Sequence, residues 1–131
     1  MNLQIYKGIH GCTEAKGVAI VIDVFRATTK ICCLLKSLPK AIFLGQGIEE
    51  VTHLIEHNDV EYFLDVPNAS RFQSIPHSSH FHDNSPLMAL TLSLENKKVL
   101  LITRNGTVAF HFVGHCDRVF AGAFVNIDSL V

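Results

Sequence analysis

Short continuous apolar runs alternate along the chain with apolar residues in helical spacing. The continuous runs, rich in β-branched residues, predict strands at 17–24, 40–45, 60–66, 98–103 and 118–122, after a shorter candidate at 2–6. Apolar residues three or four positions apart predict helices at 27–37, 48–57, 87–94 and 107–113, and the start of another at 126–131. Strands that alternate with helices are typical of βαβ units. The pattern therefore predicts an α/β fold, a three-layer α/β/α domain with a mainly parallel or mixed sheet.

The strand at 17–24 is the most apolar, and the rest of the chain is organised around it. Residues 18–22 are apolar without interruption, which predicts a strand buried on both faces. Asp23, Arg26 and Thr28 follow at once. Because ligands of open α/β sheets bind outside the carboxyl ends of the strands, we interpret these residues as the floor of an active site. The alternative is that Asp23 and Arg26 pair with each other or cap the next helix.

A second polar cluster, Arg104 to Thr107, follows a later strand. If the two strands are parallel, both clusters lie at one edge of the sheet. Helix starts and the guanidinium fork of arginine suit an anion. A carboxylate such as Asp23 suits Mg²⁺ when substrate oxygens complete its coordination. Together the clusters predict a phosphorylated ligand, although the Asn105-Gly106 pair is also a common hairpin turn.

Residues 67–83 interrupt the alternation and predict a long polar loop. Three histidines and an aspartate lie close together near its end: His77, His80, His82 and Asp83. This spacing suits a transition metal, but it is equally that of a solvated loop. Asn84, Ser85 and Pro86 then open a helix, where Ser85 is either a cap or a nucleophile.

Composition narrows the class of protein. The chain has 131 residues, of which 48% are apolar, and these numbers predict one domain with an ample core. A net charge of −1 argues against a nucleic-acid binder. No apolar run approaches the roughly 18 residues of a membrane span, and the first residues show no signal-peptide pattern.

The cysteines and the hydropathy indicate the environment of the chain. Four cysteines are scattered without a CxxC motif, which favours a reducing, cytoplasmic compartment. The mean hydropathy of +0.28 is high for so small a domain. We therefore expect the chain to form a homo-oligomer that covers its apolar surface.

Four short motifs occur in order: VIDVFRATT at 21–29, NSPL at 84–87, ITRNGT at 102–107 and AGAFVN at 121–126. The ordered set resembles the 2-phosphosulfolactate phosphatase (ComB-like) family over nearly the whole chain. The resemblance implies a Mg²⁺-dependent phosphatase that converts 2-phospho-3-sulfolactate, or a similar small phosphorylated hydroxy acid, to the free hydroxy acid and phosphate.

The resemblance also implies which residues form the site. The matching positions expected to be catalytic are Asp23, Arg26 and Ser85, and Asp23 is also the expected ligand of Mg²⁺. Those expected to bind the substrate and its phosphate are Thr28, Asn84, Asn105, Gly106 and Thr107. The small anionic substrate is the one partner implied besides further copies of the chain.

The chain departs from the family pattern at three places, one of which is Arg104, where the family has a threonine. Residues 64–69 lack the Glu-Arg pair that the family carries after its third strand, and Phe81 stands where relatives have an aspartate. Residues 1–131 are expected to be a single domain, the N-terminal portion of the longer family fold. These differences leave open an alternative, a catalytically impaired or inactive relative that serves as an anion-binding or oligomerisation module.

Overall fold

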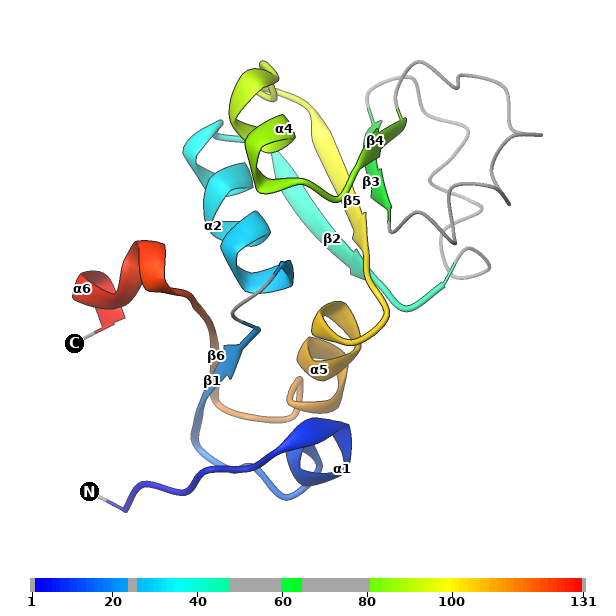
Figure 1. The fold of residues 1–131 in the computed structure, drawn as a ribbon. Coiled ribbons are helices and arrows are strands. Elements are labelled where there is room, and N and C mark those ends of the chain that lie inside the picture. Colours follow the sequence, from blue (N-terminus) through cyan, green and yellow to red (C-terminus); the bar gives the residue numbers. More distant parts are fainter. Residues whose placement is uncertain (1, 24–25, 48–59, 65–80, 131) are drawn as a thin grey trace.

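Strands and helices alternate along the chain in a computed structural model, which describes residues 2–23, 26–47, 60–64 and 81–130 (Figure 1). The strands are β1 (Val18–Ile22), β2 (Ala41–Gly45), β3 (Val60–Leu64), β4 (Phe81–Asp83), β5 (Lys98–Ile102) and β6 (Arg118–Gly122). The helices are α1 (Gly8–Cys12), α2 (Ala27–Lys36), α4 (Pro86–Thr91), α5 (Gly106–Phe112) and α6 (Ile127–Leu130), preceded by the 3₁₀ turn η4 (Phe124–Asn126). The α/β fold is confirmed. The helix expected at 48–57 lies outside the described residues.

The strands pair in parallel and fall into two sheets. One sheet has the order β2-β5-β3-β4, and the other consists of β1 and β6. The mainly parallel arrangement agrees with the sequence pattern, and the three-layer arrangement stays a prediction. No helix in the described part of the chain is long and apolar enough to cross a membrane.

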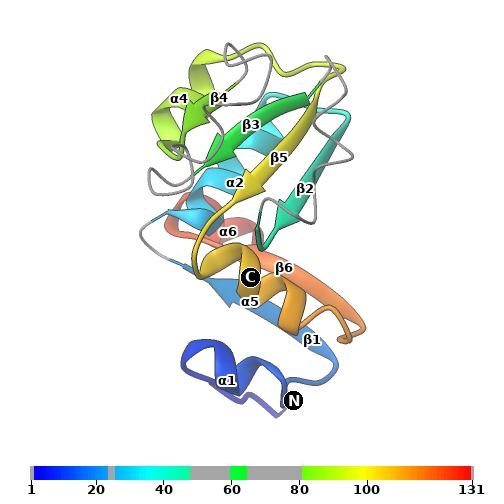
Figure 2. The ribbon, with the colours of Figure 1, turned by 90° about the vertical axis from the view of Figure 1, so that its right-hand side faces the viewer.

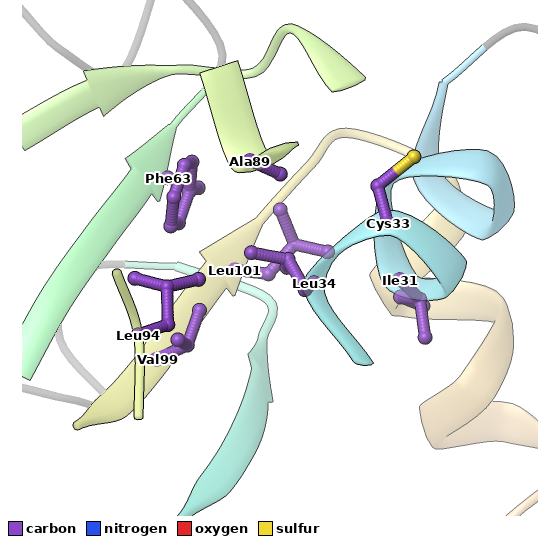
Figure 3. Packing of buried hydrophobic residues seen from close by; sticks show 8 residues of the cluster. All are labelled: Ile31, Cys33, Leu34, Phe63, Ala89, Leu94, Val99 and Leu101. Atoms are coloured by element: carbon purple, nitrogen blue, oxygen red, sulfur yellow. The ribbon is translucent and has the colours of Figure 1, made fainter. Parts of the chain in front are cut away.

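The two central strands of the four-stranded sheet, β5 and β3, are buried on both faces. On β5, Val99 and Leu101 point to the face covered by α2 and α4, whereas Leu100 and Ile102 point to the other face. Figure 3 shows the cluster on the helix-covered face, which consists of Ile31, Cys33, Leu34, Phe63, Ala89, Leu94, Val99 and Leu101. Burial on both faces explains why the sequence of β5 is apolar without interruption.

The strand β1 differs from its prediction, because it is buried on one face only. Ala19 and Val21 pack against the cluster formed with α1 and α5. Val18, Ile20 and Ile22 are 61%, 46% and 67% exposed. Figures 1 and 2 show α1 and α5 on one side of β1 and β6, and the short α6 on the other. An apolar run indicates that burial of a strand is favourable, but it does not identify the segment that covers the strand.

The N-terminal segment was predicted incorrectly. Residues 2–6 form no strand, and the short helix at Gly8–Cys12 that follows them was not predicted. Among the described residues β1 pairs only with β6, and residues 2–6 do not extend this sheet. The ring of Tyr6 instead packs on Gly11, where a Cβ would lie 2.8 Å from the Cβ of Tyr6.

Two further boundaries differ from the sequence pattern. The loop expected to run to residue 83 ends earlier, because Phe81–Asp83 pairs with β3 and Phe81 stacks on Tyr62 at 4.8 Å between ring centroids. The helix expected at 87–94 ends at Thr91, since Leu92 has extended backbone angles. The rest of the loop expected at 67–83 lies outside the described residues.

We predict that Leu101→Ala lowers the free energy of unfolding by about 2–5 kcal/mol, because it leaves a cavity in the core between the sheet and α2. Urea denaturation of the purified chain measures this change. The control is Leu87→Ala on α4, where the leucine is 74% exposed and the expected change is within about 0.5 kcal/mol. Equal losses in the two variants would contradict this account of the core.

Candidate functional site

The loop from β1 into α2 is closed by the side chain of Thr28. The N–H of Asp23 donates a hydrogen bond to Thr28 Oγ1 at 3.1 Å, and this hydroxyl donates to the Asp23 carbonyl at 2.8 Å. Thr28 is buried. Its hydroxyl therefore fixes the backbone of Asp23 at the end of the strand.

The loop from β5 into α5 is closed in the same way. The N–H of Thr103 donates to Thr107 Oγ1 at 3.1 Å, and the Thr107 hydroxyl donates to the Thr103 carbonyl at 3.0 Å. The N–H of Thr107 also donates to Thr103 Oγ1 at 3.0 Å. Both threonines are buried, so this turn is held by side chains that solvent does not reach.

The two loops meet at Gly106. A Cβ at this position would lie 2.1 Å from the Cβ of Ala27 and 2.8 Å from Oδ2 of Asp23. Only glycine permits this approach, and it places the Asp23 carboxylate beside the start of α5. The expectation that both loops share the edge of one sheet is wrong, because β1 and β5 belong to different sheets in the described chain. The two polar clusters nevertheless meet.

Lys30 is a residue of this region that the sequence analysis missed. Its side chain is fully buried in the first turns of α2. Nζ donates to the main-chain carbonyls of Asp83, at 3.3 Å, and Ser85, and it lies 3.9 Å from the centroid of the Phe63 ring. Burial lowers the pKa of Lys30 from 10.5 to about 8, against the raising effect of nearby Asp83.

A signal for Lys30 was present in the sequence. Ala27, Lys30 and Leu34 recur at spacings of three and four, so the lysine falls on the apolar face of α2. A charged residue on such a face needs partners inside the fold. Here the partners are carbonyl groups from a loop more than fifty residues away, which spacing along the chain does not identify.

The first turns of α2 bring three polar clusters to one end of the fold. The register pairs Leu64 with Asp83 on one side and with Ile102 on the other, so the ends of β4 and β5 lie about 10 Å apart. Ala27 contacts the turn after β5, and Lys30 binds the turn after β4. Asp23 directly precedes the helix.

The predicted site residues differ in exposure. Asp23 and Ser85 are half-buried, Arg26 and Asn105 are exposed, and Asn84 is buried. Arg26 is the N-cap residue of α2 by position, but its side chain makes no capping hydrogen bond. The same holds for the Ser85 side chain at the start of α4, so neither expected cap forms. The catalytic and substrate-binding roles stay predictions.

The turn around Ser85 is organised by Asp83. The Ser85 N–H donates a hydrogen bond to Asp83 Oδ1 at 2.8 Å. The backbone of Ser85 is extended, with φ −76° and ψ 131°, and Pro86 begins α4. Together with the bonds from Lys30, this contact fixes the main chain on both sides of Asn84.

The histidine cluster near β4 is only partly described. His82 Nε2 lies 2.8 Å from Oε2 of Glu61, and Lys97 Nζ lies 3.6 Å from Oε1 of the same glutamate. His77 and His80 lie outside the described residues, so the transition-metal hypothesis stays a prediction. Within the described ranges, no three His, Cys, Asp or Glu residues gather as a metal-binding group.

The donor groups nevertheless suit a Mg²⁺ site of the kind in which a phosphorylated substrate supplies some of the ligands. This ion takes one or two carboxylates and completes its shell with water and phosphate oxygens. Asp23 provides one half-buried carboxylate, whose Oδ2 lies beside the backbone of Gly106 at the start of α5. The residues present therefore fit a substrate-assisted site and not an all-protein cage.

A cavity of about 450 Å³ lies elsewhere, between α2, β2, α5, β6 and α6. Its lining is mainly apolar and includes none of the predicted site residues. The chemistry of the polar clusters therefore does not coincide with this cavity.

Comparison with known proteins gives consistent results. The model of the 2-phosphosulpholactate phosphatase family matches residues 3–131. A protein of Symbiobacterium thermophilum is 34% identical over 114 residues, which cover 86% of this chain and 47% of the relative. One from Caldanaerobacter subterraneus is 27% identical over 129 residues, covering 97% and 52%. Both are named "Probable 2-phosphosulfolactate phosphatase". The chain spans about half the length of the curated relatives it matches.

We predict that Gly106→Ala destabilises the fold by about 1–3 kcal/mol, because the new methyl group would overlap Ala27 and push Asp23 away. Chemical denaturation measures the change. Gly47→Ala is the matched control, since a Cβ at Gly47 meets no atom within 4 Å and Gly47 has no positive φ. If both variants were equally stable, the close contact would not constrain the structure.

We predict that Lys30→Met removes a rise in stability at alkaline pH. The pKa of Lys30 is about 8 when folded and near 10.5 when unfolded, so between these values the unfolded chain binds more protons. The wild-type free energy of unfolding should therefore gain up to about 1.4 kcal/mol per pH unit relative to Lys30→Met from pH 8 upward. Denaturation at pH 7.5, 8.5 and 9.5 measures the difference.

Other titrations cancel in this comparison. Burial raises the pKa of Cys32, which lowers stability above pH 9, but both variants contain this thiol. If the free energies of unfolding of the wild type and of Lys30→Met changed in parallel with pH over the whole range, the buried environment of Lys30 would be contradicted.

Proposed function

The chain belongs to the 2-phosphosulfolactate phosphatase family, and on this premise we propose that it hydrolyses the phosphate ester of a small anionic hydroxy acid similar to 2-phosphosulfolactate. The observation that carries the proposal is the meeting of Asp23 with the Gly106 turn at the first turn of α2. This contact joins the acid of Asp23, whose backbone is held by Thr28, to a turn that is held by Thr107. A site of that kind suits phosphoryl transfer, where catalysis depends on positioning and charge.

In the proposed reaction, water adds to phosphorus and the bond from phosphorus to the ester oxygen breaks. The products are the free hydroxy acid and inorganic phosphate, and the proton lost by water balances the alcohol oxygen that is released. We propose that Asp23 holds Mg²⁺ together with the phosphate oxygens of the substrate. When bound, this ion neutralises charge on the phosphoryl group.

Arg26 is proposed to bind the phosphate. Its exposed side chain begins α2, and a guanidinium group binds a phosphate through two parallel hydrogen bonds. The ten-residue helix adds a positive dipole end at the same place. Asn105 and Asn84 contribute amide groups on the two neighbouring turns, and Ser85 stands beside Asn84.

The threonines are proposed to serve the site through the backbone. The hydroxyl hydrogens of Thr28 and Thr107 are donated to carbonyl groups of the preceding strand ends. Their contribution to substrate binding is therefore to hold Asp23 and the Gly106 turn in place. The proposed cytoplasmic location and the absence of a nucleic-acid partner rest on composition alone.

One observation favours a second candidate function, anion binding without turnover. The chain spans about half the length of its curated relatives, so groups that complete catalysis in them can lie outside the matched half. In that case the chain would bind phosphate or sulfonate at Arg26 and release no phosphate.

We predict that Asp23→Asn lowers Mg²⁺-dependent phosphate release from 2-phospho-3-sulfolactate at least about 100-fold, because it removes the carboxylate that holds the ion. A colorimetric assay for inorganic phosphate measures the rate with and without EDTA. The matched control is Asp117→Asn. This exposed aspartate directly precedes β6, which is parallel to β1, so it lies at the opposite end of the two strands from Asp23, and its loss should leave the rate unchanged.

Calorimetry with inorganic phosphate separates the two candidates. The binding function is supported if the wild-type chain binds phosphate but releases none above background, while the Symbiobacterium thermophilum relative, assayed in parallel as the positive control, releases phosphate. Neither binding nor release would exclude both.

A further inference from the structure

The pair of strands β1 and β6 has one covered face and one open face. Ala19 and Val21 point toward α1 and α5. Val18, Ile20 and Ile22 point the other way, and Phe120 pairs with Ile20 in register on this side. These four residues, which we call the open face, are all more than 40% exposed.

The open face continues onto the last described segment of the chain. A Cβ at Gly122 would contact Ile20 Cγ2 at 2.8 Å, Ile22 Cγ1 at 3.0 Å and Leu130 Cδ1 at 3.6 Å, which places α6 beside the open face. Around α6, Phe124, Val125 and Ile127 are also exposed. Figure 1 shows α6 on the side of the two strands that faces away from α1 and α5.

Such a surface is unusual for a parallel pair. Parallel strands occur almost only in sheets covered on both faces, and a two-stranded sheet is marginal without further strands or helices. The exposed residues are large and apolar, and they form one patch rather than scattered positions. A patch of this kind marks a surface that another segment covers.

We propose that the open face is covered by a segment equivalent to the part of the curated relatives that lies outside the matched half. Those relatives are about twice as long as this chain, so they contain a further segment of similar size that is long enough to cover such a face. Leu130 in α6 lies near Gly122 of β6, beside the open face, so α6 covers only its margin. The covering segment presents apolar side chains to Ile20 and Ile22, with polar groups near Arg118 at the rim.

This proposal rests on family membership and the relatives' length, and not on the proposed reaction. It fails or succeeds independently of phosphate release. The competing occupant is a second copy of this chain, which the sequence analysis expected from the high mean hydropathy.

The test compares this chain with a chimera in which the part of the Symbiobacterium thermophilum relative outside the matched region follows Val131. Calorimetry measures the melting temperature of the chain and of the chimera, each with and without the double substitution Ile20→Glu and Ile22→Glu. We expect a change within about 2 °C in the chain alone, where both side chains face solvent, and a loss of at least about 5 °C in the chimera. Leu87→Glu, at an exposed leucine on α4, should leave both proteins unchanged.

Equal effects of the paired substitution in the chain and the chimera would overturn the proposal. So would sedimentation showing that the chain alone is a dimer which the paired substitution separates, because a second copy would then occupy the open face. If the chimera fails to fold, the same substitutions are tested in the intact relative. Glutamate at its positions aligned with Ile20 and Ile22 must lower its melting temperature by a similar amount, and no loss would overturn the proposal.

Discussion

The arrangement of the site depends on the absence of one methyl group. At Gly106 the backbone of the turn after β5 lies against Ala27, and no Cβ fits between them. This contact allows the first turn of α2 to rest on a loop from the other sheet. Through it, Asp23 and the Gly106 turn come together although their strands do not pair. The contact therefore replaces the shared sheet edge that usually brings such loops together.

Local pattern was a sound guide to the elements and a poor guide to what covers them. Continuous apolar runs located β2, β3 and β5, and both faces of β5 are buried as expected. The run in β1 looks the same, yet half of it faces solvent. The physical reason is that an apolar run encodes a need for burial, whereas burial itself depends on segments distant in sequence. The strand at Phe81–Asp83 escaped notice because three residues carry too little pattern.

The candidate site shows the same division. The polar residues after β1 and β5 could be found from the sequence, since charged and hydroxyl residues follow apolar runs directly. The burial of Lys30 is indicated by its place on the apolar face of α2, but its partners could not be found, because they are main-chain carbonyl groups that any sequence possesses. The capping alternatives for Arg26 and Ser85 do not hold, since a residue at the cap position need not turn its side chain toward the helix. Residue type predicts which chemistry is available, and tertiary contacts determine how it is used.

The two threonine-closed loops have a consequence for recognition. Each hydroxyl accepts from an N–H and donates to a carbonyl of one and the same residue, so each loop is held at both polar groups of a strand end. A strand end held in this way, at Asp23 or at Thr103, has little backbone freedom left to lose when a ligand arrives. The loss of conformational entropy that commonly weakens binding by flexible segments has therefore largely occurred during folding. Affinity at this end of the fold then depends mainly on the charges of the ligand and on the water that it displaces.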